Sequence, residues 1–370
     1  MPAHEGVTRP LIGITLGDPA GIGPEIVLKA LGHPEVFTWC RPVVYGQRQA
    51  LERAAAWLPR SPRIRAGAGA REVLERADAV GADADGLGVV ALVEVAGAFP
   101  PDVPVGQVSA AGGKAAFAYV EAAVRDAMEG TLDGIVTAPI HKEALHEAGI
   151  PFIGHTEMLA GLTGSAESYT MFMTGPLRIF FVTRHVSLRQ ACDLVTTERV
   201  LETARAADRF LRRLGIERPR LAVAALNPHA SDGGLMGHEE QQAIIPAVET
   251  ARREGLHVEG PVPADSVFHR AIQGHFDAVV SLYHDQGHIA AKTYDFDRTV
   301  SLTLGLPFLR TSVDHGTALD IAGTGKAREI SMLEAIRVAA QYARPWRAGQ
   351  AQGQAGRAAR SSGGVYRHDR

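Results

Sequence analysis

The chain contains 370 residues, of which 46% are hydrophobic and 21% charged, and its formal net charge is −3. These values are typical of a globular protein and provide no basic footprint for a nucleic-acid partner. The two cysteines, Cys40 and Cys192, fit a reducing compartment better than a disulfide scaffold. No stretch approaches the ~20 apolar residues of a membrane span, and the N-terminus lacks a signal-peptide core, so we expect a cytoplasmic protein without a membrane partner.

Short apolar runs such as Gly134–Thr137, Leu221–Ala225 and Ala278–Leu282 alternate with longer helical stretches, which predicts βαβ units and a largely parallel sheet. A first strand is expected at Leu11–Leu16, followed by a helix that ends near Leu31. Further helices are expected at 47–58 and 107–129. The interval Gly67–Asp85 is rich in Ala, Gly and charge, and its pattern gives no clear assignment.

The segment GDPAGIGPE, residues 17–25, lies between the first strand and its helix. It is neither the GxGxxG dinucleotide fingerprint nor the GxxxxGK[ST] phosphate loop, so neither binding mode follows from it. Its glycines indicate either a tight turn or a loop that lets a ligand approach the backbone at a helix N-terminus.

Three apolar, strand-like runs in the middle of the chain each end on a histidine. They are Ile179–His185, Leu221–His229 and Ala278–His284. Continuous apolar runs are typical of buried parallel strands, and ligands collect at the carboxyl ends of such strands. The three imidazoles therefore predict a shared site for zinc, manganese, cobalt or iron. The alternative is three separate strand-capping histidines, because no short metal signature joins them.

Polar loops follow these strands and neighbouring ones. In GHTE, residues 154–157, His155 could bind an anion or transfer a proton, whereas the alternative is a helix capped by Thr156. Asn227–Gly234 is polar and rich in glycine, as expected of a binding loop on a rigid scaffold. Asp285 could orient His284 or accept a proton.

A late segment, Gly305–Thr317, places charged groups among apolar residues. Arg310, together with Lys292, would suit a phosphate or a carboxylate. An internal salt bridge from Arg310 to Asp314 is the alternative interpretation.

The remaining elements are helices at Thr196–Leu214 and Glu239–Glu254, a strand at Thr299–Leu304 and a final helix at Ile330–Ala343. Beyond it, Arg344–Arg370 is rich in Arg, Gly, Gln and Ala, which predicts a disordered basic tail. A tail that binds RNA or a protein partner is the sharper alternative.

These segments together resemble the 4-hydroxythreonine-4-phosphate dehydrogenase family of vitamin B6 biosynthesis, including its paralogues. The resemblance spans roughly residues 10–340. The matching segments are GDPAGIGPE (17–25), TAPIHK (137–142), GHTE (154–157), TRHVSL (183–188), LNPHASDGG (226–234), GPVPADSVF (260–268), YHDQGH (283–288) and LTLGLPFLRTSVDHGTALDIAGTGKA (302–327).

The resemblance implies an α/β fold of two lobes with a central cleft, similar to isocitrate and isopropylmalate dehydrogenases. We expect a first lobe from residues 10–130 plus 300–343 and a second lobe from 131–299, followed by the tail at 344–370. It also implies a homodimer whose active site lies at the subunit interface, and NAD or NADP bound without a Rossmann fingerprint. No residue is assigned to the cofactor.

The family's functional residues map onto this chain through its motifs. The implied divalent metal (zinc, magnesium, manganese or cobalt) falls on His185, His229 and His284, with ligands drawn from both subunits. Asp265 and Asp285 match acidic residues near that metal and are the candidate catalytic groups. The implied substrate contacts are His155, Thr156, Lys292, Ser301 and Arg310.

The expected reaction is metal-dependent, NAD(P)-linked oxidation of 4-phosphohydroxy-L-threonine to a β-keto acid, which decarboxylates to 3-amino-2-oxopropyl phosphate. The family commonly has asparagine where this chain has Ser301, and a serine lacks the amide donor. Paralogues that oxidise threonate or erythronate 4-phosphate, or carboxylated aromatic cis-dihydrodiols, are therefore the alternative. A non-catalytic binding protein on the same scaffold is disfavoured by the retained histidines and cations.

Overall fold

The structure is a computed structural model that describes residues 9–78, 88–96 and 103–362, with side chains described up to residue 349. The strands of the described residues are β1 (Leu11–Thr15), β2 (Arg41–Gly46), β3 (Arg63–Gly67), β4 (Val89–Glu94), β5 (Gly134–Thr137), β6 (Tyr169–Thr174), β7 (Leu177–Phe181), β8 (Arg220–Ala224), β9 (His257–Val262), β10 (Ala278–Ser281), β11 (Val300–Leu304) and β12 (Leu309–Val313). They form a single sheet in the order β3-β4-β2-β1-β5-β12-β11-β6-β7-β10-β8-β9.

The two flanks of this sheet are parallel, as the alternating pattern predicted. On one side β1 pairs in parallel with β2 and β5, and on the other β10 pairs in parallel with β7 and β8. The middle differs, because β11 runs antiparallel to both β12 and β6, and β6 runs antiparallel to β7. The inner strands β1, β2, β8 and β10 are largely buried, which explains their near-continuous apolar sequences, whereas the edge strands β3 and β9 are partly exposed and carry charged residues.

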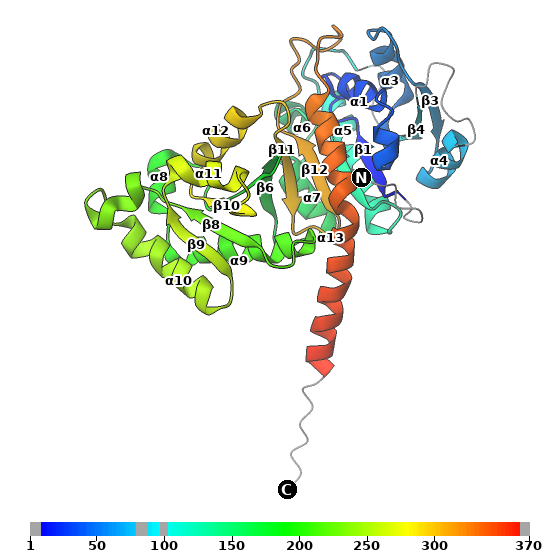
Figure 1. The fold of residues 1–370 in the computed structure, drawn as a ribbon. Helices are drawn as coiled ribbons and strands as arrows, with labels where there is room; N and C mark the ends of the chain where they lie inside the picture. Colours follow the sequence, from blue (N-terminus) through cyan, green and yellow to red (C-terminus); the bar gives the residue numbers. More distant parts are fainter. Residues whose placement is uncertain (1–8, 79–87, 97–102, 363–370) are drawn as a thin grey trace.

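The helices cover both faces of the sheet (Figure 1). Their bounds in the described residues are α1 (Gly23–Leu31), α2 (Val36–Trp39), α3 (Arg48–Ala55), α4 (Ala70–Asp78), α5 (Ala110–Met128), α6 (Lys142–Glu147), α7 (His155–Thr163), α8 (Leu188–Asp193), α9 (Thr197–Arg213), the short turns η1 (Pro228–Gly234) and η2 (Glu240–Ile244), α10 (Ile245–Arg253), α11 (Ala264–Ile272), α12 (His284–Tyr294) and α13 (Ile330–Ser362).

Most predicted elements are confirmed with small shifts at their ends. The helices expected at 47–58 and 107–129 are α3 and α5, and Ser109 caps α5 by accepting a hydrogen bond from the Gly112 N–H. The interval Gly67–Asp85, whose pattern gave no clear assignment, contains helix α4, and strand β3 ends at Gly67. These elements were missed because Gly, Ala and charged residues obscure their periodicity.

The prediction of a disordered tail from residue 344 is wrong for its first part. Helix α13 continues through Pro345 to Ser362, and Trp346 is fully buried. The Trp346 indole donates a hydrogen bond to the Leu306 carbonyl, and the Arg213 guanidinium lies 3.7 Å from its ring centroid. Composition could not reveal this packing partner. Figure 1 shows the last turns of α13 leaving the body, and residues 363–370 lie outside the described residues.

The expected division into two lobes stays a prediction, because one sheet runs through both. Figure 1 shows two portions, one with α1 to α5 and one with α8 to α11, on either side of the central strands. Strand β5, which was assigned to the second lobe, pairs with β1 and β12 of the first. Within the residues that the structure describes, no helix combines the length and apolar character needed to cross a bilayer.

Candidate active site

The GDPAGIGPE turn is tightly packed against backbone. Gly17 has φ +67°, and a Cβ built on it would lie 2.2 Å from the Pro139 carbonyl oxygen. A Cβ on Gly23 would lie 2.0 Å from the Leu16 carbonyl oxygen. The glycines therefore permit a close backbone junction, which favours the tight-turn interpretation over an open phosphate cradle.

Arg310 on β12 is the most unusual charged residue of the central strands. Its side chain is 5% exposed. The guanidinium donates from Nε and Nη2 to the Thr137 hydroxyl, at 3.0 and 2.6 Å, and from Nη1 to the Thr303 hydroxyl at 3.0 Å. Among the described residues no carboxylate pairs with it, and burial lowers its pKa to about 9. A buried cation that contacts only hydroxyl groups is suited to an anionic ligand.

Strand register explains how these groups meet. Thr303 of β11 pairs with Arg310, Ser301 pairs with Ser312, and Ser312 pairs with Thr137 of β5. Residues directly opposite each other share one face of a sheet, so the set forms a polar stripe across three strands. The predicted contact Ser301 thus lies on the same face as Arg310.

The alternative salt bridge from Arg310 to Asp314 is wrong. Asp314 instead pairs with Lys292 of α12, with 2.8 Å between Nζ and Oδ2. Burial raises the pKa of the Asp314 carboxyl, while the Lys292 ammonium acts in the opposite direction. The strand carries Arg310 into the sheet, and Asp314 follows it at the strand end.

His155 and Thr156 lie in the first turn of α7. The N-cap residue is Gly154, so the alternative role of Thr156 as a cap is wrong. His155 Nε2 is buried and has no hydrogen-bond partner among the described residues. Burial, with a further contribution from the Arg310 charge, holds the pKa of His155 well below its usual range. A neutral imidazole therefore lies near Arg310 with a ring nitrogen free to bind a ligand.

A second group of side chains gathers where β7 and β10 end. The ring centroids of His185 and His284 are 6.0 Å apart. Asp285 Oδ1 lies 2.6 Å from His284 Nδ1, and His284 Nε2 has no hydrogen-bond partner among the described residues, as in carboxylate–histidine–metal arrangements. Both histidines line a cavity of about 540 Å³ beside α8.

His288 belongs to this group, although the sequence analysis did not single it out. It lies one helical turn after His284 on α12, and the two rings stack with centroids 3.7 Å apart and an interplanar angle of 12°. On another side its ring lies 4.1 Å from that of Phe172. Burial is the main cause that lowers the pKa of His288 to about 4. The i, i+4 spacing within YHDQGH was the signal that could have found it.

His229 does not join the other two predicted ligands within one chain. In the described residues no group of three or more His, Cys, Asp or Glu side chains is arranged to hold a metal ion. His229 lies in η1 after β8, and Asp265 is exposed in the first turn of α11. One chain thus brings together two of three predicted ligands, and the shared site stays a prediction that requires a second chain.

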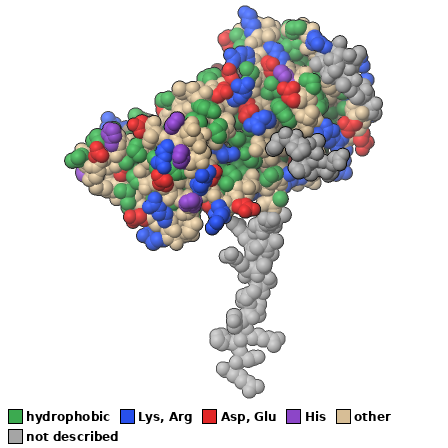
Figure 2. All heavy atoms as spheres, viewed as in Figure 1, with side chains coloured by type: hydrophobic (Ala, Val, Ile, Leu, Met, Phe, Trp, Pro, Cys, Tyr) green, Lys and Arg blue, Asp and Glu red, His purple; other side chains and the backbone are tan. Residues whose placement is uncertain are grey.

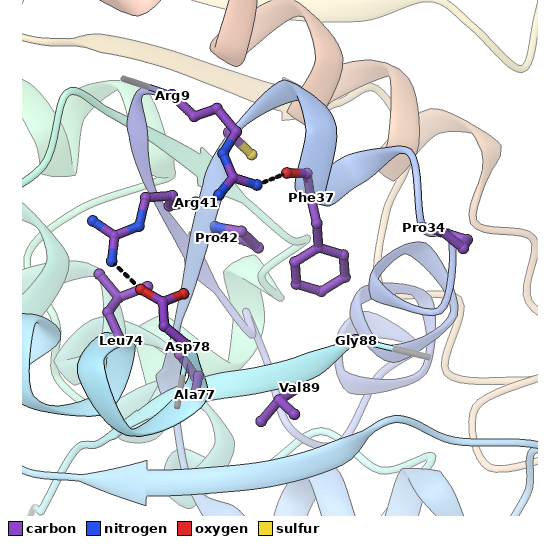
Figure 3. A pocket seen from close by; sticks show the side chains of 12 residues that line it. Arg9, Pro34, Phe37, Arg41, Pro42, Leu74, Ala77, Asp78, Gly88 and Val89 are labelled. Carbon is purple, nitrogen blue, oxygen red and sulfur yellow. Dashed lines mark hydrogen bonds and ion pairs between the residues drawn. The ribbon is translucent and has the colours of Figure 1, made fainter. Parts of the chain in front are cut away.

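A separate cavity of about 280 Å³ lies at the opposite edge of the sheet, where β2 and β4 begin (Figure 3). Arg41 pairs with Asp78 at 2.5 Å, and Arg9 donates to the Phe37 carbonyl. None of the predicted site residues lines it.

Comparison with known proteins gives the family. The chain is 53% identical to a protein of Symbiobacterium thermophilum named "Putative D-threonate 4-phosphate dehydrogenase", over 92% of this chain and 98% of that protein. It is 40% identical to the crystal structure of a 4-hydroxythreonine-4-phosphate dehydrogenase from Klebsiella pneumoniae, with a TM-score of 0.81 and coverage of 92% of this chain and 99% of the other. A terephthalate 1,2-cis-dihydrodiol dehydrogenase from Burkholderia xenovorans is 31% identical, with a TM-score of 0.60 and coverage of 90% and 98%.

The structural match confirms the expected fold, which resembles that of isocitrate and isopropylmalate dehydrogenases. Residues 38–339 match the family described as "Pyridoxal phosphate biosynthetic protein PdxA". The resemblance drawn from the sequence motifs is therefore confirmed, and the chain belongs to the PdxA family of dehydrogenases.

Proposed function

We propose that this dehydrogenase oxidises a four-carbon sugar-acid 4-phosphate, with D-threonate 4-phosphate as the first candidate and NAD or NADP as the hydride acceptor. The observation that carries the proposal is the buried guanidinium of Arg310, which has only hydroxyl partners in the described structure. The choice of substrate follows the 53% identical relative rather than the 40% identical structure.

Such a substrate has an anionic group at each end. Arg310 would bind one end, with His155 Nε2 adding a neutral hydrogen-bonding group beside it. Lys292 would bind the other end, because its ammonium is partly exposed and its only carboxylate partner in the described residues is Asp314. Two fixed cations at a set separation would align the carbon that carries the reacting hydroxyl.

The proposed reaction has two stages, an oxidation and a decarboxylation. In the first, the C3 hydroxyl loses its proton, C3 loses a hydride to the nicotinamide, and a ketone forms. In the second, the resulting β-keto acid releases carbon dioxide, and a proton replaces the carboxylate at C2. The same stages would convert 4-phosphohydroxy-L-threonine to 3-amino-2-oxopropyl phosphate.

The histidine group fits a divalent metal in part. His284 Nε2 is free, its Nδ1 contacts Asp285, and burial is the main cause that lowers the pKa of the neighbouring His185, so its imidazole is available in the neutral form that binds metals. When bound there, a metal would act as a Lewis acid that lowers the pKa of the substrate hydroxyl. The third ligand would be His229 of the partner subunit. Because Asp285 is engaged with His284, Asp265 is the better candidate for the general base.

Exposed apolar side chains support a homodimer in which each metal site has two halves, the His185–His284 group of one subunit and His229 of the other. Beside the His185–His284 group, Leu188 is 62% and Ile289 64% exposed. Beside His229, Leu235 is 86% exposed. Exposed apolar side chains beside a site can mark an interaction surface, so we propose that the surface with Leu188 and Ile289 meets the surface with Leu235 across the subunit interface.

The test of substrate class is a panel measured by nicotinamide reduction. The panel contains D-threonate 4-phosphate, D-erythronate 4-phosphate, 4-phosphohydroxy-L-threonine and a carboxylated cis-dihydrodiol. We expect the highest kcat/KM with D-threonate 4-phosphate and little turnover of unphosphorylated D-threonate. Preference for the dihydrodiol would overturn the proposal.

A second candidate is the biosynthetic substrate 4-phosphohydroxy-L-threonine, which the name of the Klebsiella structure favours. This substrate differs from threonate 4-phosphate by an amino group in place of the C2 hydroxyl. A Ser301→Asn variant restores the residue common in the biosynthetic family. We expect it to raise kcat/KM for the amino substrate relative to threonate 4-phosphate, and an unchanged ratio would show that Ser301 does not determine the choice.

The shared metal site can be tested by mixing two inactive variants. His229→Ala removes a ligand from one half and His284→Ala from the other. If the halves come from different subunits, a mixed dimer has one intact site, and activity should return to about one quarter of the wild-type value after random exchange. No recovery, with exchange verified by mass spectrometry, would place all ligands in one chain.

A further inference from the structure

The loop that carries His229 has a backbone conformation that L-amino acids rarely adopt. His229, Ala230, Ser231 and Asp232 have φ values of 53°, 55°, 65° and 44°, and Gly233 follows with 70°. Single residues visit the left-handed region, but a run of this kind is disfavoured because each Cβ crowds the following carbonyl oxygen. Such a run persists only where surrounding contacts hold it in place.

Glu240 provides the central contacts. Its side chain is fully buried. Oε1 accepts hydrogen bonds from the Leu226 N–H at 2.8 Å and the Asn227 N–H at 2.7 Å, and Oε2 accepts one from Asn227 Nδ2 at 2.8 Å. In the described structure no Lys or Arg pairs with this carboxylate. These partners all belong to residues 226 and 227, which lead into the left-handed run.

The residues on either side of Glu240 hold the same loop. Glu239 Oε2 accepts a second hydrogen bond from Asn227 Nδ2 at 2.7 Å. Gln241 Nε2 donates to the Gly233 carbonyl at 2.7 Å, at the far end of the left-handed run. Three consecutive side chains therefore fix both ends of the loop from 227 to 233.

The backbone under Glu240 is itself irregular. Glu240–Ile244 forms a π-helical turn before α10 begins, a feature often found at functional sites. Pro246 has no N–H, so the Gln242 carbonyl lacks its usual helical donor. The Thr197 hydroxyl is placed to donate to this carbonyl and, at 3.2 Å, to that of Ala243. The wide turn is thus stabilised from α9.

We propose that Glu240 is a positioning residue, which holds the left-handed loop so that His229 reaches the metal site of the partner subunit. The inference rests on the proposed function, because it takes His229 as a ligand supplied across the dimer interface. Glu240 touches neither substrate nor metal in this arrangement, and it acts through the backbone of residues 226 and 227.

The first measurement needs no turnover. In a Glu240→Ala variant, amide hydrogen exchange in the segment 226–234 should become faster by at least about tenfold, with α9 and β8 unchanged. Affinity for Mn²⁺ added to metal-free dimer should fall by about 10- to 100-fold, as for other residues that orient a ligand. The matched control is Glu249→Ala on exposed α10 surface, which should change neither value.

Subunit mixing then tests where Glu240 acts. At a Mn²⁺ concentration too low to load Glu240→Ala, the mixture of this variant with His284→Ala should recover activity, because one site of the mixed dimer contains intact halves. Glu240→Ala mixed with His229→Ala should recover none, because both changes fall on the same half. Recovery in the second mixture, or none in the first with exchange verified, would overturn the proposal.

A Glu240→Gln variant covers the case in which Glu240→Ala fails to fold. It keeps one carbonyl oxygen for the two backbone N–H groups but presents an amide donor to Asn227. We expect a folded dimer with an intermediate loss of Mn²⁺ affinity. A wild-type rate of amide hydrogen exchange in 226–234 and a wild-type affinity for Mn²⁺ in this variant would contradict the positioning role.

Failure of the proposed function can be told apart from failure of this inference. If wild-type protein oxidises no substrate of the panel, the proposed function fails, while the exchange measurement still decides whether Glu240 holds the loop.

Discussion

The two groups of candidate site residues differ in how much of the arrangement one chain completes. The proposed anion site around Arg310 lies inside the sheet, where β5, β11 and β12 hold the guanidinium between the hydroxyls of Thr137 and Thr303. The histidine group lies at the strand ends, on helix and loop positions near the surface, and contains two of the three predicted ligands. Figure 2 shows histidines on the surface of the portion that contains α8 to α11.

The difference follows from the physics of each site. An anion that binds a buried cation needs preorganised donors and exclusion of water, which strand pairing within one chain provides. A metal site at an exposed edge can take ligands from two chains, so its assembly depends on association. If both proposed sites exist, we expect substrate anion binding to survive in a monomer, whereas tight metal binding would require the proposed dimer.

The largest effect should come from removing a predicted metal ligand. His284→Ala should lower kcat/KM by about 10³-fold, because Lewis-acid stabilisation contributes several kcal/mol and each 1.36 kcal/mol changes the rate tenfold. His275→Ala, at an exposed histidine away from both groups, is the control and should keep wild-type turnover. Full activity of metal-stripped His284→Ala would refute the role of the metal.

Arg310→Met tests the preorganised side of the comparison. We expect KM for the phosphorylated substrate to rise by about 100-fold, because the variant removes a buried charge-assisted contact. Turnover of a neutral diol analogue should change little, and Arg310→Lys should fall between the two because it keeps the charge without the planar fork. Equal losses for charged and neutral substrates would make Arg310 a structural residue.

Asp285→Asn should have a smaller effect, confined to the histidine side. Metal affinity, followed by titration of metal-free dimer with Mn²⁺, should weaken by about 10- to 100-fold, because the amide no longer supports the His284 ring as a charged partner. Binding of inorganic phosphate to the Arg310 site should remain unchanged. A parallel loss of phosphate binding would show that the two groups are one coupled site.

The smallest expected effect is a pH dependence of anion binding. Burial lowers the pKa of Arg310 to about 9, and the guanidinium binds anions only in its charged form, which is present below that pKa. Phosphate affinity, measured by calorimetry, should therefore weaken several-fold as the pH rises through about 9. Arg310→Met should show weak binding without this step, and an equal step in that variant would assign it to another group.

Much of the architecture could be predicted because local patterns report local structure. Continuous apolar runs identified β7, β8 and β10, and amphipathic periodicity identified α5 and α9. The family followed from ordered motifs and is confirmed by the match over residues 38–339. The antiparallel middle of the sheet was not predicted, because pairing between β11 and β6 depends on residues far apart in the chain.

The candidate site residues divide in the same way, into those that the sequence could identify and those that only the structure revealed. The three histidines could be selected because each ends an apolar run, where side chains point to chemistry. Arg310 and His155 were selected as substrate contacts through the motifs that the chain shares with its family. Only the tertiary structure showed that Lys292, and not Arg310, pairs with Asp314. It also showed that His288 stacks on His284 and that Glu240 holds the loop of His229.

The sequence determined which side chains this protein can offer and in which strands and helices they begin, since these properties depend on neighbours a few residues away. The tertiary structure decided which of those side chains meet, which are buried without a partner and which lie apart within one chain. Those outcomes depend on contacts between distant segments, because the groups packed against a buried charge or a left-handed turn determine whether it is stable.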